Sequence, residues 1–169
     1  MRVRAYWKKL KHLRWHSFLR MQRIVSRTFS HIITVSNSAK TDIGLDFNIP
    51  LKRFRVIPNG INTELFYPLE GIVREPNRII VTNSADTPLK GLYYLLQGVA
   101  VLAQTHPIKL VVIGTPKKNG GIVKLIRKLG IGSLVRFTGR ISSDEFRRQY
   151  ARATLAVIPS VYEGFGLPV

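Results

Sequence analysis

Residues 78–113 read RIIVTNSADTPLKGLYYLLQGVAVLAQTHPIKLVVI, and this stretch decides the fold. Its two ends, Arg78–Asn83 and Ile108–Ile113, are short and mainly apolar, which is typical of strands buried in a parallel sheet. Between them, Leu89–Thr105 carries apolar residues at helical spacing on one face, namely Leu92, Leu95, Leu96, Val99 and Leu102. A strand, a helix and a second strand in this order predict a right-handed βαβ unit.

The chain continues this alternation after residue 113. A glycine closes the next helix, and a serine caps the one after it. The predicted elements are the helix Gly120–Leu129 ended by Gly130, the strand Leu134–Thr138, the helix Ser142–Tyr150 capped by Ser142 or Ser143, and the strand Thr154–Pro159. Strands that alternate with helices predict an α/β fold with a parallel, doubly wound sheet.

A long basic helix is predicted over residues 2–29. Its apolar residues keep a spacing of three or four with one interruption, and they are Val3, Trp7, Leu10, Phe18, Met21, Val25 and Phe29. We expect this stripe to pack on the helix's own domain, with the Lys and Arg side chains in solvent. The alternative is a helix that lies on a membrane surface, with Trp7 and Trp15 near the headgroups.

A shorter α/β pattern follows the basic helix. It consists of the strand His31–Val35, a helix that begins at the cap residues Ser36–Ser38 and runs to about Leu45, the strand Phe54–Ile57 and the turn Pro58–Gly60. Residues 61–77 contain Pro68, Gly71 and Pro76 and have little periodicity. We interpret residues 61–77 as a linker between a first domain, residues 1–60, and a second, residues 78–169.

Composition limits the classes of function. The net charge is +18, and residues 1–30 hold nine Lys or Arg and no Asp or Glu, a field that attracts polyanions. The chain has no cysteine, which excludes disulfides and thiolate metal sites. Basic residues interrupt the apolar stretches at the start, so neither a signal peptide nor a membrane span is predicted. We expect a cytoplasmic protein. Peripheral attachment to the inner face of the membrane is compatible with that expectation.

The unusual residues of the second domain collect where its strands end. Ligands of an open α/β sheet bind beyond the carboxyl ends of the strands. Lys90 follows the first of these strands at the predicted start of a helix, where the helix dipole and the lysine charge together suit a diphosphate. Gly114 and Gly139 follow the next two strands and allow close approach of a ligand. Taken alone, Lys90 is better interpreted as an ordinary solvated lysine, and each glycine equally well as part of a tight turn.

The most specific piece is Glu163-Gly164-Phe165-Gly166, after the last predicted strand. Its glycines leave N–H groups free to face phosphate oxygens, and Glu163 can accept hydrogen bonds from sugar hydroxyls. The alternative is a surface glutamate in a loop. The stretch is not a dinucleotide fingerprint, because residues 83–91 after the first strand contain only Gly91.

These motifs resemble the retaining glycosyltransferases of family 4, also called group 1 glycosyltransferases. The matching segments occur in the family's order and spacing from about residue 15 onward, and they are His31–Ser36, Val56–Ile61, Lys90–Gly91, Val135–Gly139 and Glu163–Pro168. The resemblance implies a GT-B architecture of two Rossmann-like domains. Residues 1–60 would then be the end of the acceptor-side domain, and residues 78–169 most of the nucleotide-sugar-binding domain.

The resemblance also assigns roles to individual residues. The lysine that matches Lys90 binds the donor diphosphate, and the glutamate that matches Glu163 contacts the donor sugar, so we expect these two to be the catalytic residues. Ile141 would lie beside the nucleotide base, and Asn59 and Gly60 would line the interdomain cleft. The full set of expected donor-binding residues is Ser84, Lys90, Gly91, Gly114, Arg140, Ile141, Glu163, Gly164, Phe165, Gly166 and Leu167.

The chain departs from the family pattern in three places. The family usually carries an arginine where this chain has Ser84, so a phosphate-facing charge is missing or is supplied by a residue such as Arg140. A second glutamate, which typically binds the nucleotide ribose, would lie beyond Val169. The early acceptor domain, with its glycine-rich loop and histidine, is absent. We therefore expect the chain as given not to turn over efficiently.

The predicted function is hexosyl transfer from a UDP- or GDP-sugar to an acceptor hydroxyl, with retention, in the synthesis of lipopolysaccharide, exopolysaccharide or glycolipid. No cofactor or metal is expected, because the nucleotide-sugar is a substrate. The expected partners are that donor, an unidentified carbohydrate or lipid-linked acceptor, and an anionic membrane surface. The main alternative is a basic module that binds polyanions, although no nucleic-acid motif is present. The missing glycine fingerprint argues against a dehydrogenase.

Overall fold

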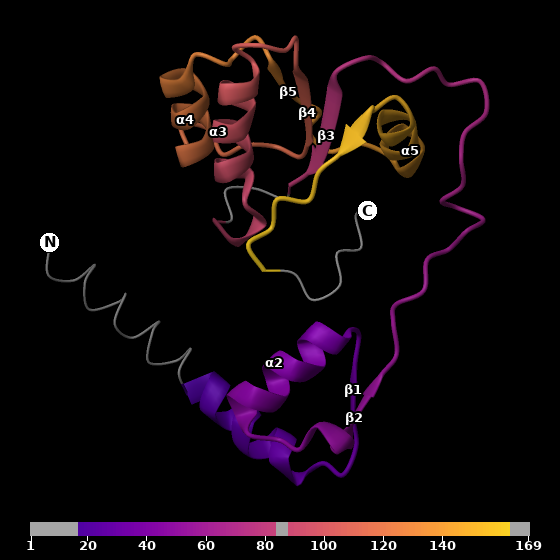
Figure 1. The fold of residues 1–169 in the computed structure, drawn as a ribbon, viewed down its shortest axis with the longest axis vertical. Coiled ribbons are helices and arrows are strands. Elements are labelled where there is room, and N and C mark those ends of the chain that lie inside the picture. The colour runs from indigo at the N-terminus through magenta and orange to yellow at the C-terminus, as the bar shows by residue number, and fades with distance from the viewer. Residues whose placement is uncertain (1–16, 84–87, 163–169) are drawn as a thin grey trace, which may run out of the picture. The chain divides into compact units, whose positions relative to one another are not determined.

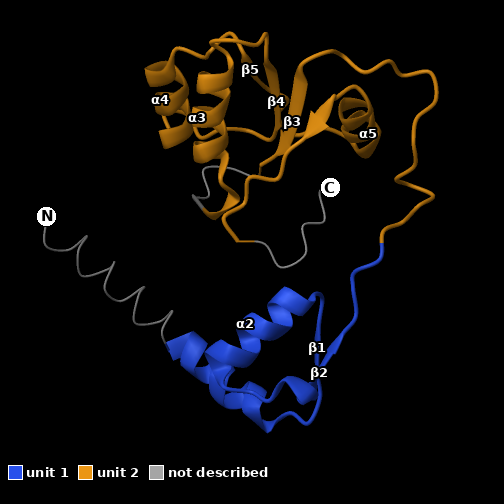
Figure 2. Cartoon of the chain, viewed as in Figure 1, with its two compact units in different colours: residues 1–60 blue, residues 61–169 orange. Residues whose placement is uncertain are grey.

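The computed structural model describes residues 17–83 and 88–162. The chain forms two compact units, residues 1–60 and 61–169 (Figure 2). Each unit is built around its own parallel sheet, and the second sheet is the larger (Figure 1).

The first unit consists of two helices and two short strands. A helix over residues 17–28 leads to β1 (Ile32–Thr34), α2 (Asn37–Phe47), a short 3₁₀ turn and β2 (Phe54–Val56). The two strands pair in parallel. The predicted cap is present, since the Ser36 side chain accepts a hydrogen bond from the Ala39 N–H at 3.0 Å.

Arginine side chains bind the ends of the helices in the first unit. Arg27 Nε donates to the Phe47 carbonyl at the end of α2 at 2.8 Å, and Arg53 donates to the Arg27 carbonyl at 2.9 Å. Carbonyls in a last helical turn lack intrahelical partners and carry partial negative charge, so a guanidinium stabilises them. Some of the basic residues near the start of the chain are therefore structural.

The second unit contains a four-stranded parallel sheet in the order β5-β4-β3-β6. The strands are β3 (Arg78–Thr82), β4 (Lys109–Ile113), β5 (Val135–Phe137) and β6 (Leu155–Ala156). The chain places β4 and β5 on one side of β3 and then returns to place β6 on the other. The doubly wound α/β prediction is thereby confirmed, and the strand order reverses between β3 and β6.

Helices cover both faces of this sheet (Figure 1). On one face, α3 (Leu92–Leu102) and α4 (Gly121–Leu129) bury Leu96 and Leu125 against Leu110 and Val112. On the other, α5 (Ser143–Ala151) packs on a smaller cluster around Ile80. The predicted caps Gly130 and Ser142 end α4 and begin α5.

The segment before β3 is packed against the second unit. Phe66 contacts Phe146 of α5 edge to face at 6.3 Å between ring centres. The Thr154 hydroxyl donates to the Glu75 carbonyl at 2.6 Å. The Arg78 side chain is buried, donates to the Glu75 carboxylate at 2.6 Å and also contacts Gln149. Residues 61–77 thus belong to the compact unit that follows them.

Three expectations for the elements need correction. The helix predicted from Leu89 begins at Leu92, because Pro88–Lys90 form a separate 3₁₀ turn that ends at Gly91. The strand predicted over Thr154–Pro159 pairs only at Leu155–Ala156. The apolar stripe of the first helix was predicted to pack on its own domain, but its described residues Phe18, Met21, Val25 and Phe29 are 44–54% exposed.

Candidate functional site

The carboxyl edge of the second sheet gathers most of the described candidate residues. In a doubly wound sheet the ligand crevice lies where the strand order reverses, here between β3 and β6. Asn83 follows β3, Gly114 follows β4 and Gly139 follows β5. The backbone ties these positions together, because the Gly139 N–H donates to the Gly114 carbonyl at 3.1 Å and the Asn83 N–H to the Ile113 carbonyl at 3.0 Å.

Gly114 permits a close approach of two of these segments. Its φ is 143°, and a Cβ at this position would lie 2.1 Å from the Asn83 carbonyl oxygen. A side chain would therefore push the end of β4 away from the end of β3. Gly114 therefore allows the backbones at the ends of β3 and β4 to lie close together at this edge of the sheet.

Gly91 joins the start of α3 to the loop after β6. It is the N-cap of α3 with a φ of 69°, and a Cβ there would lie 1.7 Å from the Pro159 carbonyl oxygen. The Val161 N–H donates to the Leu89 carbonyl at 2.9 Å on the same side. Because glycine has no side chain to cap a helix, the first N–H groups of α3 are left to backbone, water or ligand. This helix end has the character of an anion site.

Lys90 precedes this helix end directly. It is the last residue of the 3₁₀ turn Pro88–Lys90 and is half-buried. The sequence predicted it inside the first turn of the helix, whereas the structure places it before the cap. The turn still holds the lysine next to the N-terminus of α3 and the loop after β6.

Arg140 and Ile141 follow β5. Arg140 is exposed, and Ile141 is half-buried against the cluster that contains Ile80, Val111 and Ile113. Ile141 therefore packs on the α5 face of the sheet, which is a structural role beside the base-binding one predicted for it.

Asn83 was not among the site residues predicted from the sequence. Its side chain is buried, and both its amide nitrogen and its amide oxygen lack a hydrogen-bond partner among the described residues. Buried polar atoms are nearly always paired, so an unpaired amide at the carboxyl end of the central strand is unusual. A polar residue directly after an apolar strand was the available signal.

Tyr150 of α5 lies beneath the same edge. Its hydroxyl forms a 2.8 Å hydrogen bond with the Thr82 hydroxyl at the end of β3. Burial raises the pKa of Tyr150 above its usual value of 10.0, and the hydrogen bond with Thr82 offsets part of that rise. The phenol is therefore neutral at physiological pH and holds α5 on the sheet.

Several predicted site residues lie outside the described residues. They are Ser84, Glu163, Gly164, Phe165, Gly166 and Leu167. Asn59 and Gly60 are exposed at the end of the first unit, and their place in an interdomain cleft stays a prediction. Within residues 17–83 and 88–162, no three His, Asp or Glu side chains are grouped so that they could hold a metal ion. No helix in the same ranges is long and apolar enough to span a bilayer.

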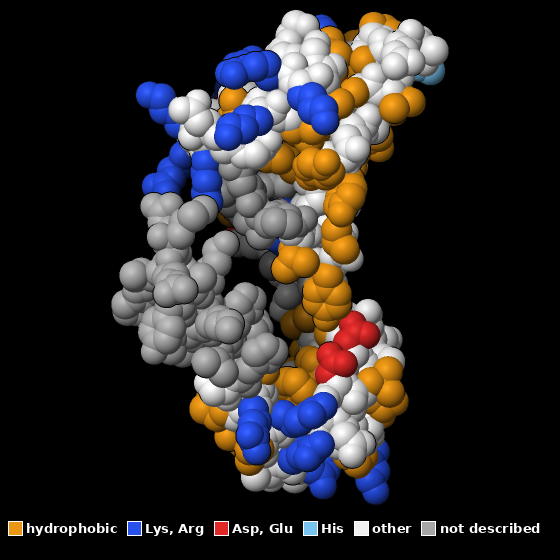
Figure 3. Space-filling model, turned by 90° about the vertical axis from the view of Figure 1, so that its left-hand side faces the viewer, with side chains coloured by type: hydrophobic (Ala, Val, Ile, Leu, Met, Phe, Trp, Pro, Cys, Tyr) orange, Lys and Arg blue, Asp and Glu red, His pale blue; other side chains and the backbone are white. Residues whose placement is uncertain are grey.

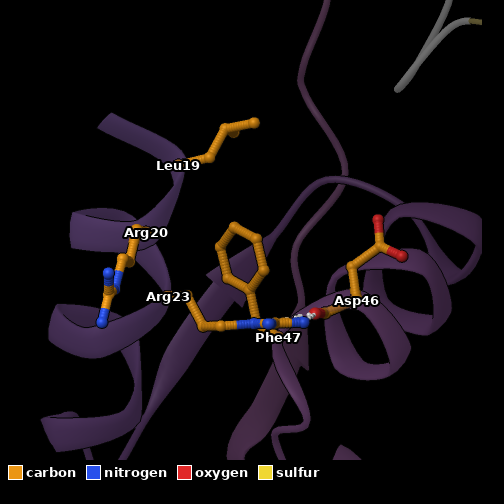
Figure 4. A pocket seen from close by; sticks show the side chains of 5 residues that line it. All are labelled: Leu19, Arg20, Arg23, Asp46 and Phe47. Carbon is orange, nitrogen blue, oxygen red and sulfur yellow. Dashed lines mark hydrogen bonds between the residues drawn. The ribbon is translucent and has the colours of Figure 1, made fainter. Parts of the chain in front are cut away.

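A pocket lies within the first unit. It is lined by Leu19, Arg20, Arg23, Asp46 and Phe47 (Figure 4). The Arg23 side chain crosses it and donates to the Asp46 carbonyl. This pocket lies at the junction between the first helix and the end of α2.

Two family models together match almost the whole chain. Residues 70–169 match the model described as glycosyl transferases group 1, and residues 2–65 match the model described as glycosyltransferase family 4. The first match alone covers more than half of the chain.

Curated relatives and solved structures agree with these matches. The chain is 41% identical over 163 residues to an MMP α-(1→4)-mannosyltransferase of Mycolicibacterium hassiacum, which covers 96% of this chain and 39% of the relative. It is 25% identical over 138 residues to an O-antigen chain mannosyltransferase of Salmonella typhimurium, which covers 82% of this chain and 38% of the relative. The chain thus spans about two fifths of the length of these relatives.

Among solved structures, the chain resembles a sucrose-phosphate synthase of Thermosynechococcus elongatus. The TM-score is 0.72 at 23% identity, over 90% of this chain and 40% of that one. At this identity the likeness supports the fold alone, and it agrees with the two parallel-sheet α/β units described above.

Proposed function

The chain belongs to the group 1 glycosyltransferases, and from that membership we propose that the protein transfers a hexosyl group from a nucleotide-diphosphate sugar to an acceptor hydroxyl with retention of configuration. Two of the relatives are mannosyltransferases by name, so mannose is the hexose we propose. The acceptor would be a carbohydrate or a lipid-linked sugar of the cell envelope.

The observation that carries this proposal is the carboxyl edge between β3 and β6. At this edge the N-cap of α3 is Gly91, whose backbone lies against the Pro159 carbonyl and which has no side chain to cap the helix. Lys90 directly precedes this N-cap. A helix N-terminus and a lysine together suit the two phosphates of a sugar nucleotide. We assign Lys90 and the first N–H groups of α3 to the donor diphosphate.

The proposed chemistry depends on stabilising the leaving group. As the bond from the anomeric carbon to the diphosphate oxygen breaks, negative charge grows on the diphosphate. Fixed donors and cations that face this charge lower the barrier, because they need no reorganisation during the step. Glu163 would accept hydrogen bonds from the sugar hydroxyls and orient the ring, and Gly164, Phe165, Gly166 and Leu167 would hold sugar and phosphate through the backbone.

The polyanion-binding alternative is weakened by the first unit. Arg27 and Arg53 donate to main-chain carbonyls at the ends of helices, and Arg23 donates to Asp46. These guanidinium groups account for part of the basic character at the start of the chain without any external polyanion.

Calorimetric titration with GDP and UDP tests the proposal. We expect Lys90→Ala to weaken binding of the preferred nucleotide about tenfold or more, since a charge-assisted hydrogen bond contributes ~1.5–3 kcal/mol. Lys109→Ala is the matched control, because Lys109 is an exposed lysine at the amino end of β4, at the opposite edge of the sheet. Equal effects of both substitutions, or no nucleotide binding by the folded chain, would contradict the assigned donor site.

A further inference from the structure

The second unit has an uneven distribution of charge along the chain. From residue 88 to residue 143 there is no Asp or Glu, whereas there are nine Lys or Arg. Five of the nine lie on α4 and on the turn before it, and all five are exposed, namely Lys117, Lys118, Lys124, Arg127 and Lys128. None of them forms an ion pair with a residue in the described ranges.

The geometry of α4 concentrates this charge on one surface. Ile122 and Leu125 face the sheet and are buried, so positions 124, 127 and 128 form the opposite, outward stripe of the helix. Residues three and four apart on a helix are neighbours, and like charges at these spacings destabilise an isolated helix. Lys124 repels Arg127 and Lys128 in this way, whereas the last-turn position of Arg127 and Lys128 is itself favourable, so the charge of the stripe stays available to an external anion.

The neighbouring helix α3 adds exposed aromatic and aliphatic side chains. Tyr93 and Tyr94 are exposed and contact each other edge to face at 5.5 Å between ring centres. Val101 and Leu102 are exposed near the other end of the helix. Because α3 and α4 pack side by side on one face of the sheet, their outward sides form one surface (Figure 1). Figure 3 shows Lys and Arg side chains beside hydrophobic ones on this side of the second unit.

We infer that the outward surface of α3 and α4 binds an anionic lipid bilayer. Clustered cations attract anionic headgroups, and tyrosines are enriched where protein meets the headgroup layer. A nucleic acid fits this surface less well, because single strands are bound in a cationic groove with aromatics that stack on bases, whereas this surface is the outer side of two helices. The inference goes beyond the proposed transferase function and does not depend on it.

The basic surface begins at the candidate donor site. Lys117 and Lys118 follow Gly114 by a few residues, in the loop between β4 and the N-terminus of α4. A bilayer on this surface would extend along α4 and reach the carboxyl edge of the sheet at Lys117 and Lys118. That placement suits an acceptor that is itself anchored in the membrane.

Co-sedimentation of the full chain with vesicles tests the inference. Phosphatidylcholine vesicles with and without phosphatidylglycerol serve as the probe. The variant Lys124→Glu/Arg127→Glu/Lys128→Glu should bind anionic vesicles on the order of a hundredfold more weakly, since each cation near an anionic surface contributes ~1 kcal/mol. Tyr93→Ser/Tyr94→Ser should weaken binding less, and the loss should persist at high salt.

A matched control separates local from bulk charge. Lys109→Glu/Arg136→Glu/Arg148→Glu makes the same change in net charge with exposed residues of the second unit that lie away from α3 and α4. This control should keep most of the binding, and circular dichroism should show all variants folded. Equal losses in both triple variants would overturn the inference, because bulk charge would then explain binding. Loss of duplex DNA binding in the α4 variant, with vesicle binding unchanged, would overturn it in favour of a nucleic-acid surface.

Discussion

The first helix and α3 have similar sequence patterns and different burial. Both carry large apolar residues at a spacing of three or four. Phe18, Met21 and Val25 of the first helix are 44–51% exposed, whereas Leu96 and Val99 of α3 are at most 1% exposed. Periodicity thus predicts a helix equally well in both places, but it does not predict what the apolar stripe contacts.

The difference lies in the sheet that each helix has available. In the second unit, β3, β4 and β5 present a continuous apolar face, and α3 and α4 cover it together. In the first unit, the sheet has two strands of three residues each. A surface of that size cannot cover the stripes of two helices. We therefore expect the two units to respond very differently to equivalent substitutions.

The largest effect is expected at the centre of the second unit. Leu96→Ala should lower the free energy of unfolding of that unit by about 3 kcal/mol or more, because it leaves a cavity where the side chain is fully buried. Hydrogen exchange of peptides from β3 and β4 measures the change within the unit. An effect below about 1 kcal/mol would show that the core packs more loosely than the structure describes.

A smaller loss of unfolding free energy is expected at two glycines with the same positive φ. Comparing them separates the cost of the backbone conformation from the cost of a close contact. Gly91 and Gly130 both have a φ of 69°, but only Gly91 has an atom in the way of a Cβ, the Pro159 carbonyl oxygen. Gly130→Ala should cost about 1–2 kcal/mol for the left-handed conformation alone. Gly91→Ala should cost about 1 kcal/mol more than Gly130→Ala and should also weaken GDP or UDP binding, as the loop after β6 is displaced. Equal costs, with nucleotide binding intact, would show that the loop adapts freely.

The ion pair at the start of β3 should make the second unit sensitive to acid. The hydrogen bond from Arg78 holds the pKa of Glu75 below its usual value of 4.5. This stabilisation is fully present above pH 4.5 and is lost as the pH falls through the lower pKa of the folded state. Because Glu75 is partly exposed, we expect the effect to be at most ~1 kcal/mol.

The measurement for this ion pair is the free energy of unfolding as a function of pH. Glu75→Gln should be less stable than the unsubstituted chain at neutral pH, and the two should converge below pH 4.5. A constant difference across that range would mean that Glu75 acts through its size and not through its charge.

The smallest effect is expected on the exposed stripe of the first helix. Met21 is about half exposed, so Met21→Ser should change the free energy of unfolding by no more than ~0.5 kcal/mol. Hydrogen exchange of peptides from α2 and β1 is the appropriate measurement. A loss above ~1.5 kcal/mol would show that this stripe is covered in solution.

Local signals predicted the helix ends well. Ser36, Gly130 and Ser142 act as caps where the sequence placed them, because capping depends on a few adjacent residues. Lys90 was predicted inside the start of the helix, but it lies two residues before α3 begins. The leucines around it continue the helical spacing, but the positive φ of Gly91 ends that regularity, and a Cβ at this position would meet the Pro159 carbonyl oxygen.

Contacts between distant segments were beyond the sequence pattern. Arg78 was predicted as the first residue of a strand, but its buried side chain contacts Gln149, which is 71 residues further along the chain. The burial of the Asn83 amide without a partner among the described residues could not be predicted, because it depends on how the end of β4 packs beside Asn83. The donor site that the family motifs indicate stays a prediction, including the roles of Ser84 and of residues 163–167.

The position of β3 in the middle of the sheet also has a consequence for how the chain is made. β3 pairs early with β4, whereas its other edge waits for β6, and Ile79 meets Leu155 only near the end of the unit. During synthesis on the ribosome, the cluster under α3 and α4 can therefore assemble while the edge of β3 that receives β6 is still open. An open edge of this kind is a template for pairing with another chain. The nascent protein should be most vulnerable to aggregation between the emergence of β4 and that of β6, an interval in which a chaperone would be of most use.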